Sequence, residues 1–232
     1  MVRGATGFLV LLLGLAVVAF WPSYLATFPA GDAHVHTHAA LMLLWFGLLF
    51  VQPMLVRSGR LDLHRTLGRL SCVLVPLIAL QSLLLAHARI QLLDDAVMQA
   101  EGHFLFLPLA GAWLFLAAWA LGVAHRRRTP MHARFMLGTA LALIDPVVAR
   151  LLFFFAPPLP HLLLYSAIGY GLTDALLLVL LLRERPGSPA RRAYALLLAV
   201  FGVTHLLWFT LGQTPAWLAF AYAFRGLGGA GG

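Results

Sequence analysis

Long apolar stretches recur along this chain, separated by short polar turns, and they constrain its fold more than any other feature. A helix needs about 20 mostly apolar residues to cross the hydrocarbon core of a bilayer. Seven stretches meet this requirement, at residues 5–28, 33–56, 67–88, 103–124, 132–155, 161–182 and 193–212. We therefore predict an all-α fold, in which residues 1–232 form a single domain: an integral membrane bundle of seven transmembrane helices.

The composition supports this class. Hydrophobic residues make up 62% of the chain and charged residues only 10%, whereas a soluble domain averages about 25% charged residues. This balance excludes an ordinary soluble protein, a disordered chain and a nucleic-acid binder that works in water, despite a net charge of +8. The expected partner is the lipid bilayer. Residues 213–232, aromatic at first and then glycine-rich, are expected to form an interfacial tail with a disordered end.

The first apolar stretch also resembles a signal peptide, because Arg3 precedes an apolar run. Cleavage would leave six spans. No small-x-small cleavage site follows the run, however, and Trp21 and Tyr24 are placed as interface anchors. We expect the first span to be retained.

The arginines predict the orientation. Thirteen of the 16 basic residues, all of which are arginine, lie before the first span or flank the second, fourth and sixth connections. Since cytoplasmic loops are enriched in positive charge, we expect a cytoplasmic N-terminus. The absence of lysine excludes a Schiff-base mechanism. Arginine-rich, lysine-free usage is typical of GC-rich bacterial genomes, so we expect the cytoplasmic (inner) membrane of a bacterium.

Histidines and carboxylates gather on the predicted outer side of the membrane. The chain is histidine-rich, with ten histidines. The outer set comprises His34, His36, His38, His87, His103 and His161, together with Asp32, Asp94, Asp95 and Glu101. Such a mixture of imidazoles and carboxylates is a set of metal ligands.

The opening of the second span carries the clearest spacing. If Asp32 caps that helix, His34 and His38 lie four residues apart on one face, while His36 points elsewhere. This spacing suits two imidazole ligands of one metal ion. The second, fourth and sixth spans are each expected to begin with a histidine (His38, His103 and His161), and these would converge if the hairpins packed around one axis.

We therefore predict a bound metal ion (zinc, copper or iron) or a haem b. The candidate ligands are His34, His38 and His103, with His87 and His161 as further candidates. The alternative is that these are hydrated interface histidines without a metal.

A second group of polar residues lies deep in the predicted spans: Gln81, Asp145, Arg150, Asp174 and His205. Ionisable groups at membrane depth are expensive and usually face a partner or a cavity. Pro146 follows Asp145 and is expected to kink its helix. Tyr170 lies four residues before Asp174, a spacing that suits a hydrogen bond. This group forms either a polar cavity or proton path, or a hydrogen-bonded clasp between helices.

The predicted inner side carries the most distinctive string, from Arg60 to Arg69. Here His64, Arg65 and Arg69, with His132 from a later turn, are candidates to hold an anionic group such as a lipid headgroup, a haem propionate or a phosphate. The alternative is that they serve only topology and helix capping.

The strings Leu63–Arg69 and Met131–Leu137, preceded by the outer histidines, resemble a group of poorly characterised bacterial multi-pass membrane proteins. That group carries a histidine-rich opening, an L-H-R-x-L-G turn and an H-x-R-x-M-L helix start. The resemblance covers roughly residues 33–150 and implies family and fold, with no activity attached.

Two better-known groups offer more distant resemblances. The chain is similar to cytochrome b561-like proteins in having helix histidines (His38, His87, His103 and His205) that would supply axial haem ligands. It is similar in topology to the seven-span zinc hydrolases related to ceramidases and adiponectin receptors. Those enzymes carry two histidines four residues apart on the last helix, where this chain offers only His205.

These observations predict a multi-pass membrane protein with a histidine-ligated metal or haem site toward its outer face, acting in membrane electron transfer with a redox or small-molecule partner. The alternatives are a zinc-dependent membrane hydrolase and a small transporter that uses the membrane-buried aspartates and His205. The sequence leaves open whether the chain is an enzyme and how many copies assemble.

Overall fold

The computed structural model describes residues 2–28 and 32–227, and within these ranges the chain is helical, with no strand. Seven helical stretches of the described chain are long and apolar enough to span a membrane, so the predicted all-α multi-pass bundle is confirmed. In six of these spans the main helix is α1 (Val2–Phe20), α2 (Ala33–Arg57), α3 (Leu61–Gln91), α5 (Phe106–Ala124), α8 (Leu163–Arg183) or α9 (Pro189–Phe209). The fifth span is divided into α6 (Thr129–Leu141) and α7 (Ile144–Phe155).

Polar side chains cap the N-termini of several of these helices by accepting a hydrogen bond from the first turn. Asp32 Oδ1 accepts a hydrogen bond of 2.9 Å from the Val35 N–H, which confirms the predicted cap of α2. Ser188 caps α9 in the same way through Arg191 N–H. The turns before α3 and α9 contain Gly59 and Gly187 at φ of 73° and 77°, a backbone conformation that favours glycine.

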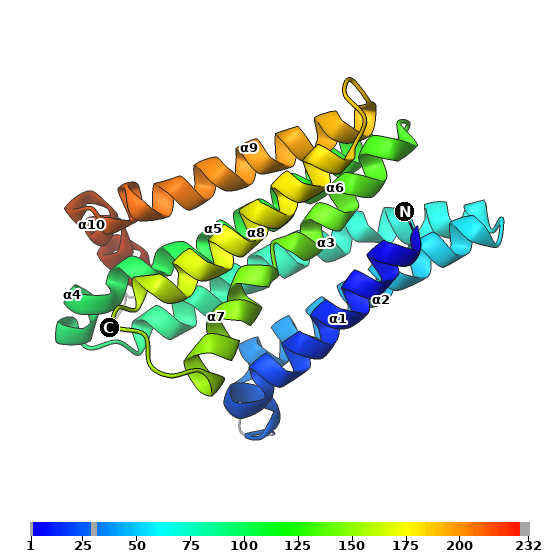
Figure 1. Ribbon diagram of the computed structural model, residues 1–232. Coiled ribbons are helices and arrows are strands. Elements are labelled where there is room, and N and C mark those ends of the chain that lie inside the picture. Colours follow the sequence, from blue (N-terminus) through cyan, green and yellow to red (C-terminus); the bar gives the residue numbers. More distant parts are fainter. Residues whose placement is uncertain (1, 29–31, 228–232) are drawn as a thin grey trace.

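The two ends of the bundle differ in chemistry. Figure 1 shows the N-terminus at the same end as the turns that join α2 to α3, α5 to α6 and α8 to α9. These turns carry the arginine runs, so we call this end the arginine end. The opposite end, which we call the histidine end, carries the remaining connections and the C-terminal helix α10 (Pro215–Arg225).

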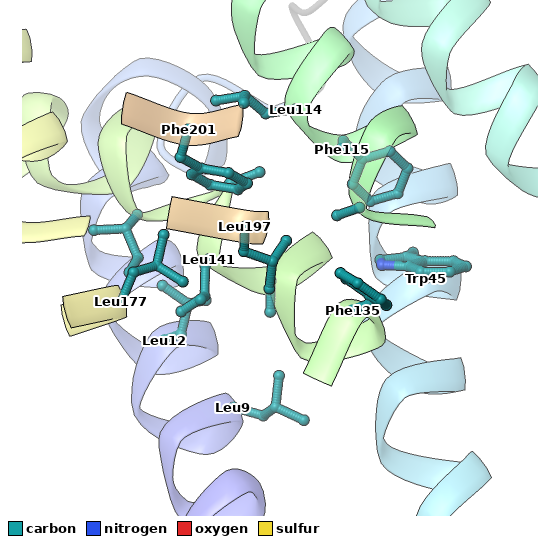
Figure 2. Close-up of a cluster of buried hydrophobic side chains, with 14 of the residues drawn as sticks. Leu9, Leu12, Trp45, Leu114, Phe115, Phe135, Leu141, Leu177, Leu197 and Phe201 are labelled. Atoms are coloured by element: carbon teal, nitrogen blue, oxygen red, sulfur yellow. The ribbon is translucent and has the colours of Figure 1, made fainter. Parts of the chain in front are cut away.

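The helices form a ring in the order α1, α2, α3, α5, α9, α8 and α7, in which each packs against the next and α7 returns to α1. Helix α6 packs against α5 and α9, and seven of its 13 residues are buried. It therefore fills the middle of the ring toward the arginine end. Figure 2 shows Phe135 and Leu141 of α6 among side chains of the ring helices. These side chains are Leu9, Leu12, Trp45, Leu114, Phe115, Leu177, Leu197 and Phe201.

The fifth span breaks at Ala142 and Leu143, just before the Asp145-Pro146 pair. Pro146 has no N–H to donate to the carbonyl four residues earlier, and its ring crowds that carbonyl. Beyond the break, α7 packs against α1 and α8, and Figure 1 shows it leaning away from α6 toward α1. The predicted kink is confirmed, and it moves the chain from the middle of the bundle into the ring.

The described part of the C-terminal tail is ordered. A 3₁₀ turn (Leu211–Gln213) leads into α10, which packs across the histidine end against α3 and the 3₁₀ turn Gly102–Leu105. Arg225 donates to the Leu93 carbonyl at 3.1 Å and pairs with Asp95 at 2.6 Å. The glycine-rich end that we expected to be disordered, residues 228–232, lies outside the described residues.

Candidate functional site

Three helices bring four polar side chains together at membrane depth. Asp145 comes from the start of α7, Tyr170 and Asp174 from the middle of α8, and His205 from α9. His205 Nδ1 donates to Asp174 Oδ2 over 2.9 Å, and the His205 ring stacks on Tyr170 with centroids 3.9 Å apart and an interplanar angle of 14°. We call these four residues the Asp174 cluster. The hydrogen bond that we expected between Tyr170 and Asp174 is replaced by these contacts with His205.

Asp145 lies next to the other three residues because Gly169, which has no side chain, lets α7 pack closely against α8. The backbone of α7 passes so close to α8 that a Cβ atom at Gly169 would lie 2.5 Å from Asp145 Oδ1 and 3.0 Å from Asp145 Cα. The carboxyl of Asp145 interacts electrostatically with Tyr170, the next residue along α8. Of the predicted clasp, the hydrogen bond between α8 and α9 is present, whereas Arg150 bonds to neither aspartate and α7 joins only by close packing at Gly169.

Both aspartates in the cluster have an unused oxygen. Oδ1 of Asp145 and Oδ1 of Asp174 are buried, and neither finds a hydrogen-bond donor among the described residues. A buried carboxylate oxygen without a donor costs free energy that a bound proton or a water molecule removes. These two oxygens, like the buried Nδ1 of His64, therefore lack a partner that a proton or a water molecule would supply.

Arg150 lies on α7 between the cluster and the histidine end. Its Nη1 donates to the Pro146 carbonyl at 2.9 Å, and its guanidinium lies 4.4 Å from the ring centroid of Phe20 on α1. It interacts electrostatically with Asp145 and with His38 of α2. Arg150 therefore connects the candidate residues of α2 with those of α7.

A cleft of about 230 Å³ opens beside Arg150, between the start of α5, α7 and α8. The surface of the cleft is almost entirely apolar, and the residues that line it are Phe104, Leu107, Ala149, Arg150, Phe153, Leu162, Tyr165 and Ser166. The cleft lies where α7 has left the middle of the bundle. The break in the fifth span thus creates a hollow on the histidine side of the Asp174 cluster.

A second cavity, of about 410 Å³, adjoins the cleft, because Phe104 and Leu162 line both. It brings together three candidates from the sequence, His103, His161 and Glu101, and Gln213 lines it as well. His103 stacks on Trp208, with centroids 5.7 Å apart. We expected His103 and His161 to begin α-helices, but His103 lies in a 3₁₀ turn and His161 lies in the turn before α8.

His34 and His38 lie on one face of α2, as their spacing predicted, and the structure shows that this face packs against α3. Gln81 Nε2 lies 3.1 Å from His34 Nδ1 and donates to the His34 carbonyl at 3.0 Å. Ser82 Oγ lies 3.5 Å from His38 Nδ1. His36 points to the other side, where its Nδ1 lies 3.0 Å from the hydroxyl of Tyr24.

His87, the remaining outer candidate, lies against the ring of Phe224 of α10 and 3.5 Å from Gln91. Across residues 2–28 and 32–227, no group of three or more His, Cys, Asp or Glu side chains is arranged to hold a metal ion. The outer histidines thus divide among the α2–α3 contact, the second cavity and the α10 contact. Metal and haem binding by these residues stays a prediction.

The candidates at the arginine end fall into two groups. His64 and His132 face each other inside the bundle with ring centroids 6.4 Å apart, and His132 Nδ1 donates to the Gly122 carbonyl at 2.8 Å. Arg65 and Arg69 are exposed, and Arg65 pairs with Asp62 on the surface at 3.3 Å. The two histidines therefore meet each other and not the exposed arginines, and binding of an anionic group by these four residues stays a prediction.

Sequence reasoning missed one buried ion pair. Arg134 of α6 donates from Nη2 and Nε to Glu184 Oε1, at 2.6 and 3.1 Å, and the side chains are only 8% and 21% exposed. We had counted Arg134 only as a topology signal. The clue was Glu184, a lone carboxylate inside the arginine-rich sixth connection.

Comparisons with known proteins add no relative. No protein-family model matches the chain, and the searches found no similar curated protein and no similar solved structure.

Proposed function

We propose that this multi-pass membrane protein is a small transporter that carries protons, and that the Asp174 cluster is its proton-binding site. One observation carries the proposal: two carboxyl groups at membrane depth each have a buried oxygen without a donor among the described residues, and one of them is hydrogen-bonded to His205. Membrane-buried acidic residues and histidines are the usual elements of proton relays.

The broken fifth span supports a transporter. Transporters commonly build their sites from discontinuous helices at membrane depth, where the freed backbone lines a cavity. Here the break lies immediately before Asp145, and the cleft opens on the same helix at Arg150. In this proposal a proton enters from the histidine end through the second cavity and the cleft.

We infer that the arginine end faces the cytoplasm, since positively charged turns are retained on that side. The histidine end then faces outward, and the membrane is the cytoplasmic membrane of a bacterium. Protons would reach the Asp174 cluster from the outer side.

Labelling with a hydrophobic carbodiimide tests the proton-binding site, because this reagent attacks carboxyl groups that are protonated in apolar surroundings. We expect peptide mass spectrometry to find the adduct on Asp145 or Asp174, with the labelling of each lost in its Asp→Asn variant. Asp62, an exposed carboxylate at the arginine end, is the matched control and should stay unlabelled. Absence of label on both cluster aspartates would refute the assignment.

Proton flux into vesicles tests transport. We expect lipid vesicles that contain the protein and a trapped pH dye to acidify after an outward potassium gradient is opened with valinomycin. Asp174→Asn should slow this at least about tenfold, which corresponds to about 1.4 kcal/mol in an activation barrier, while Asp62→Asn should not. Acidification no faster than in empty vesicles would refute proton transport.

A metal ion or a haem b at the histidine end is a second proposal, favoured by the cavity that His103 and His161 share. Two imidazoles and a water molecule would supply part of a zinc, copper or iron shell, and Glu101, which interacts electrostatically with His103, would act as the base in a hydrolase. Elemental analysis of protein purified without a histidine tag is expected to give about one metal per chain, with loss in His103→Ala. A metal content near zero would reject this proposal.

A further inference from the structure

We propose that His64 and His132 form a binding site for a soft, singly charged metal ion, Cu(I), inside the arginine end of the bundle. The site lies at the opposite end from the metal or haem proposed above, and it does not depend on proton transport. The proposal rests on lone-pair atoms that come from α2, α3 and α6.

The hydrogen bond of His132 leaves its other ring nitrogen free to act as a ligand. Nδ1 of His132 donates to the Gly122 carbonyl of α5 at 2.8 Å, so in the neutral ring Nε2 carries the lone pair. Metal-binding histidines almost always donate their second N–H in this way, because the bond fixes the tautomer and the orientation of the ring. His132 is therefore prepared to bind a cation through Nε2.

His64 and Gln52 contribute atoms that lack a partner. Nδ1 of His64 and Oε1 of Gln52 are buried, and neither has a hydrogen-bond partner among the described residues. The His64 ring interacts with the backbone of Gln52. The Gln52 amide lies beside Gly68, one turn after His64, where a Cβ atom would be 3.9 Å from Nε2 of the amide. Two buried acceptors at one end of the bundle call for a donor or a cation.

The two imidazole rings are spaced to share one ion. Their centroids lie 6.4 Å apart, and the rings interact electrostatically. A metal ion lies about 2.0–2.1 Å from an imidazole nitrogen, so two rings that share an ion have centroids about 5–6.5 Å apart, with the largest value for a linear arrangement. The observed spacing fits the linear arrangement. Cu(I) accepts two imidazoles on opposite sides, whereas structural zinc takes four ligands in a tetrahedron.

The charge of the surroundings also favours a singly charged ion. Arg65 interacts electrostatically with His64, and the two imidazoles are neutral when they act as ligands. Since repulsion is proportional to the charge of the ion, a divalent ion would be opposed twice as strongly as Cu(I).

Competition with the Cu(I) chelator bicinchoninate tests the site in protein purified in detergent. A Cys72→Ser background removes the single thiol, which would itself bind Cu(I). We expect His132→Leu to lower the number of bound Cu(I) ions by about one per chain. The matched control is His125→Leu, which should change nothing. His125 lies at the same end and its Nδ1 also bonds to a backbone carbonyl, but its ring faces Phe135.

Two substitutions of similar volume separate ligation from packing. Leucine and methionine are close in size, but only methionine carries a soft sulfur ligand. His64→Leu should lose the ion and His64→Met should retain it. For the same reason, added Cu(I) should raise the melting temperature of the parent and of His64→Met, but not that of His64→Leu.

Three results would overturn the inference. The first is Cu(I) binding that His132→Leu leaves unchanged. The second is equal Cu(I) binding in His64→Leu and His64→Met, whether retained or lost. The third is an X-ray absorption spectrum of the parent that shows sulfur next to the copper, since that would place the ion on methionine.

Discussion

Adding one methyl group at Gly169 should destabilise the bundle at the point where α7 approaches α8. A Cβ atom there would lie 2.5 Å from Asp145 Oδ1 and 3.0 Å from Asp145 Cα, so that both a side chain and a backbone must move. Overpacking of this kind costs about 1–3 kcal/mol. Gly171, two residues away on the same helix, has nothing within 4 Å of its Cβ position and provides a matched control.

The magnitude follows from these two environments. In Gly171→Ala only helix propensity changes, which favours alanine by about 1 kcal/mol. In Gly169→Ala the same gain is opposed by the overpacking cost and by displacement of Asp145 from the Asp174 cluster. Since about 1 kcal/mol changes the melting temperature by about 2–4 °C in a domain of this size, the two variants should melt about 2–12 °C apart.

Thermal unfolding in detergent, followed by intrinsic tryptophan fluorescence, measures this difference. Carbodiimide labelling of Asp145 in the same samples shows whether the carboxyl group has moved. Equal melting temperatures for the two variants, or a more stable Gly169→Ala, would show that the contact between α7 and α8 is looser than described and would refute the reasoning.

Three further changes have defined outcomes. Glu184→Gln removes the carboxylate that the buried Arg134 meets at 2.6 Å, and it should cost about 3 kcal/mol or more in chemical denaturation; a loss below about 1 kcal/mol would mean that the pair behaves like a surface pair. Trp45→Phe removes the 3.1 Å hydrogen bond from Nε1 to Thr139 Oγ1 between α2 and α6, and it should cost about 0.5–1.5 kcal/mol while helix content by circular dichroism stays constant. The hydrogen bond from the Val35 N–H holds the pKa of Asp32 below the ordinary value of 3.8, so its contribution to stability is full above 3.8 and is lost as the pH falls through the lowered pKa. As the pH is lowered from about 5 to about 1, the melting temperature of Asp32→Asn should therefore fall less than that of the wild type, and an equal fall would place the acid sensitivity elsewhere.

The sequence predicted what local chemistry determines. The hydrophobic runs predicted the lengths of the spans. The side chain of Asp32 predicted the cap of α2, and Pro146 predicted the break in the fifth span. Helical periodicity predicted that His34 and His38 share one face of α2, but not that this face meets α3. Each of these features depends on a few neighbouring residues.

The arrangement of the helices did not follow, because in a membrane protein the surfaces that face lipid and those that face other helices are equally apolar. Phe135 is fully buried in the middle of the bundle and Leu43 is 62% exposed, although both lie in apolar stretches. The central place of α6 therefore had no sequence signal. For the same reason, the pairing of Asp174 with His205, 31 residues apart, could be offered only as one of two alternatives.

The division of the fifth span also determines where the membrane voltage falls. Helix α6 fills the bundle toward the arginine end with tightly packed apolar side chains, whereas the cleft on the other side of the Asp174 cluster opens toward the histidine end. In the membrane, an electric field concentrates across the part of a protein that excludes water. In the proposed transport path, in which water fills the second cavity and the cleft, a proton that enters from the histidine end crosses little of the voltage before it meets Asp145. A charge that continues past α6 crosses most of it, at about 2.3 kcal/mol per elementary charge for each 100 mV.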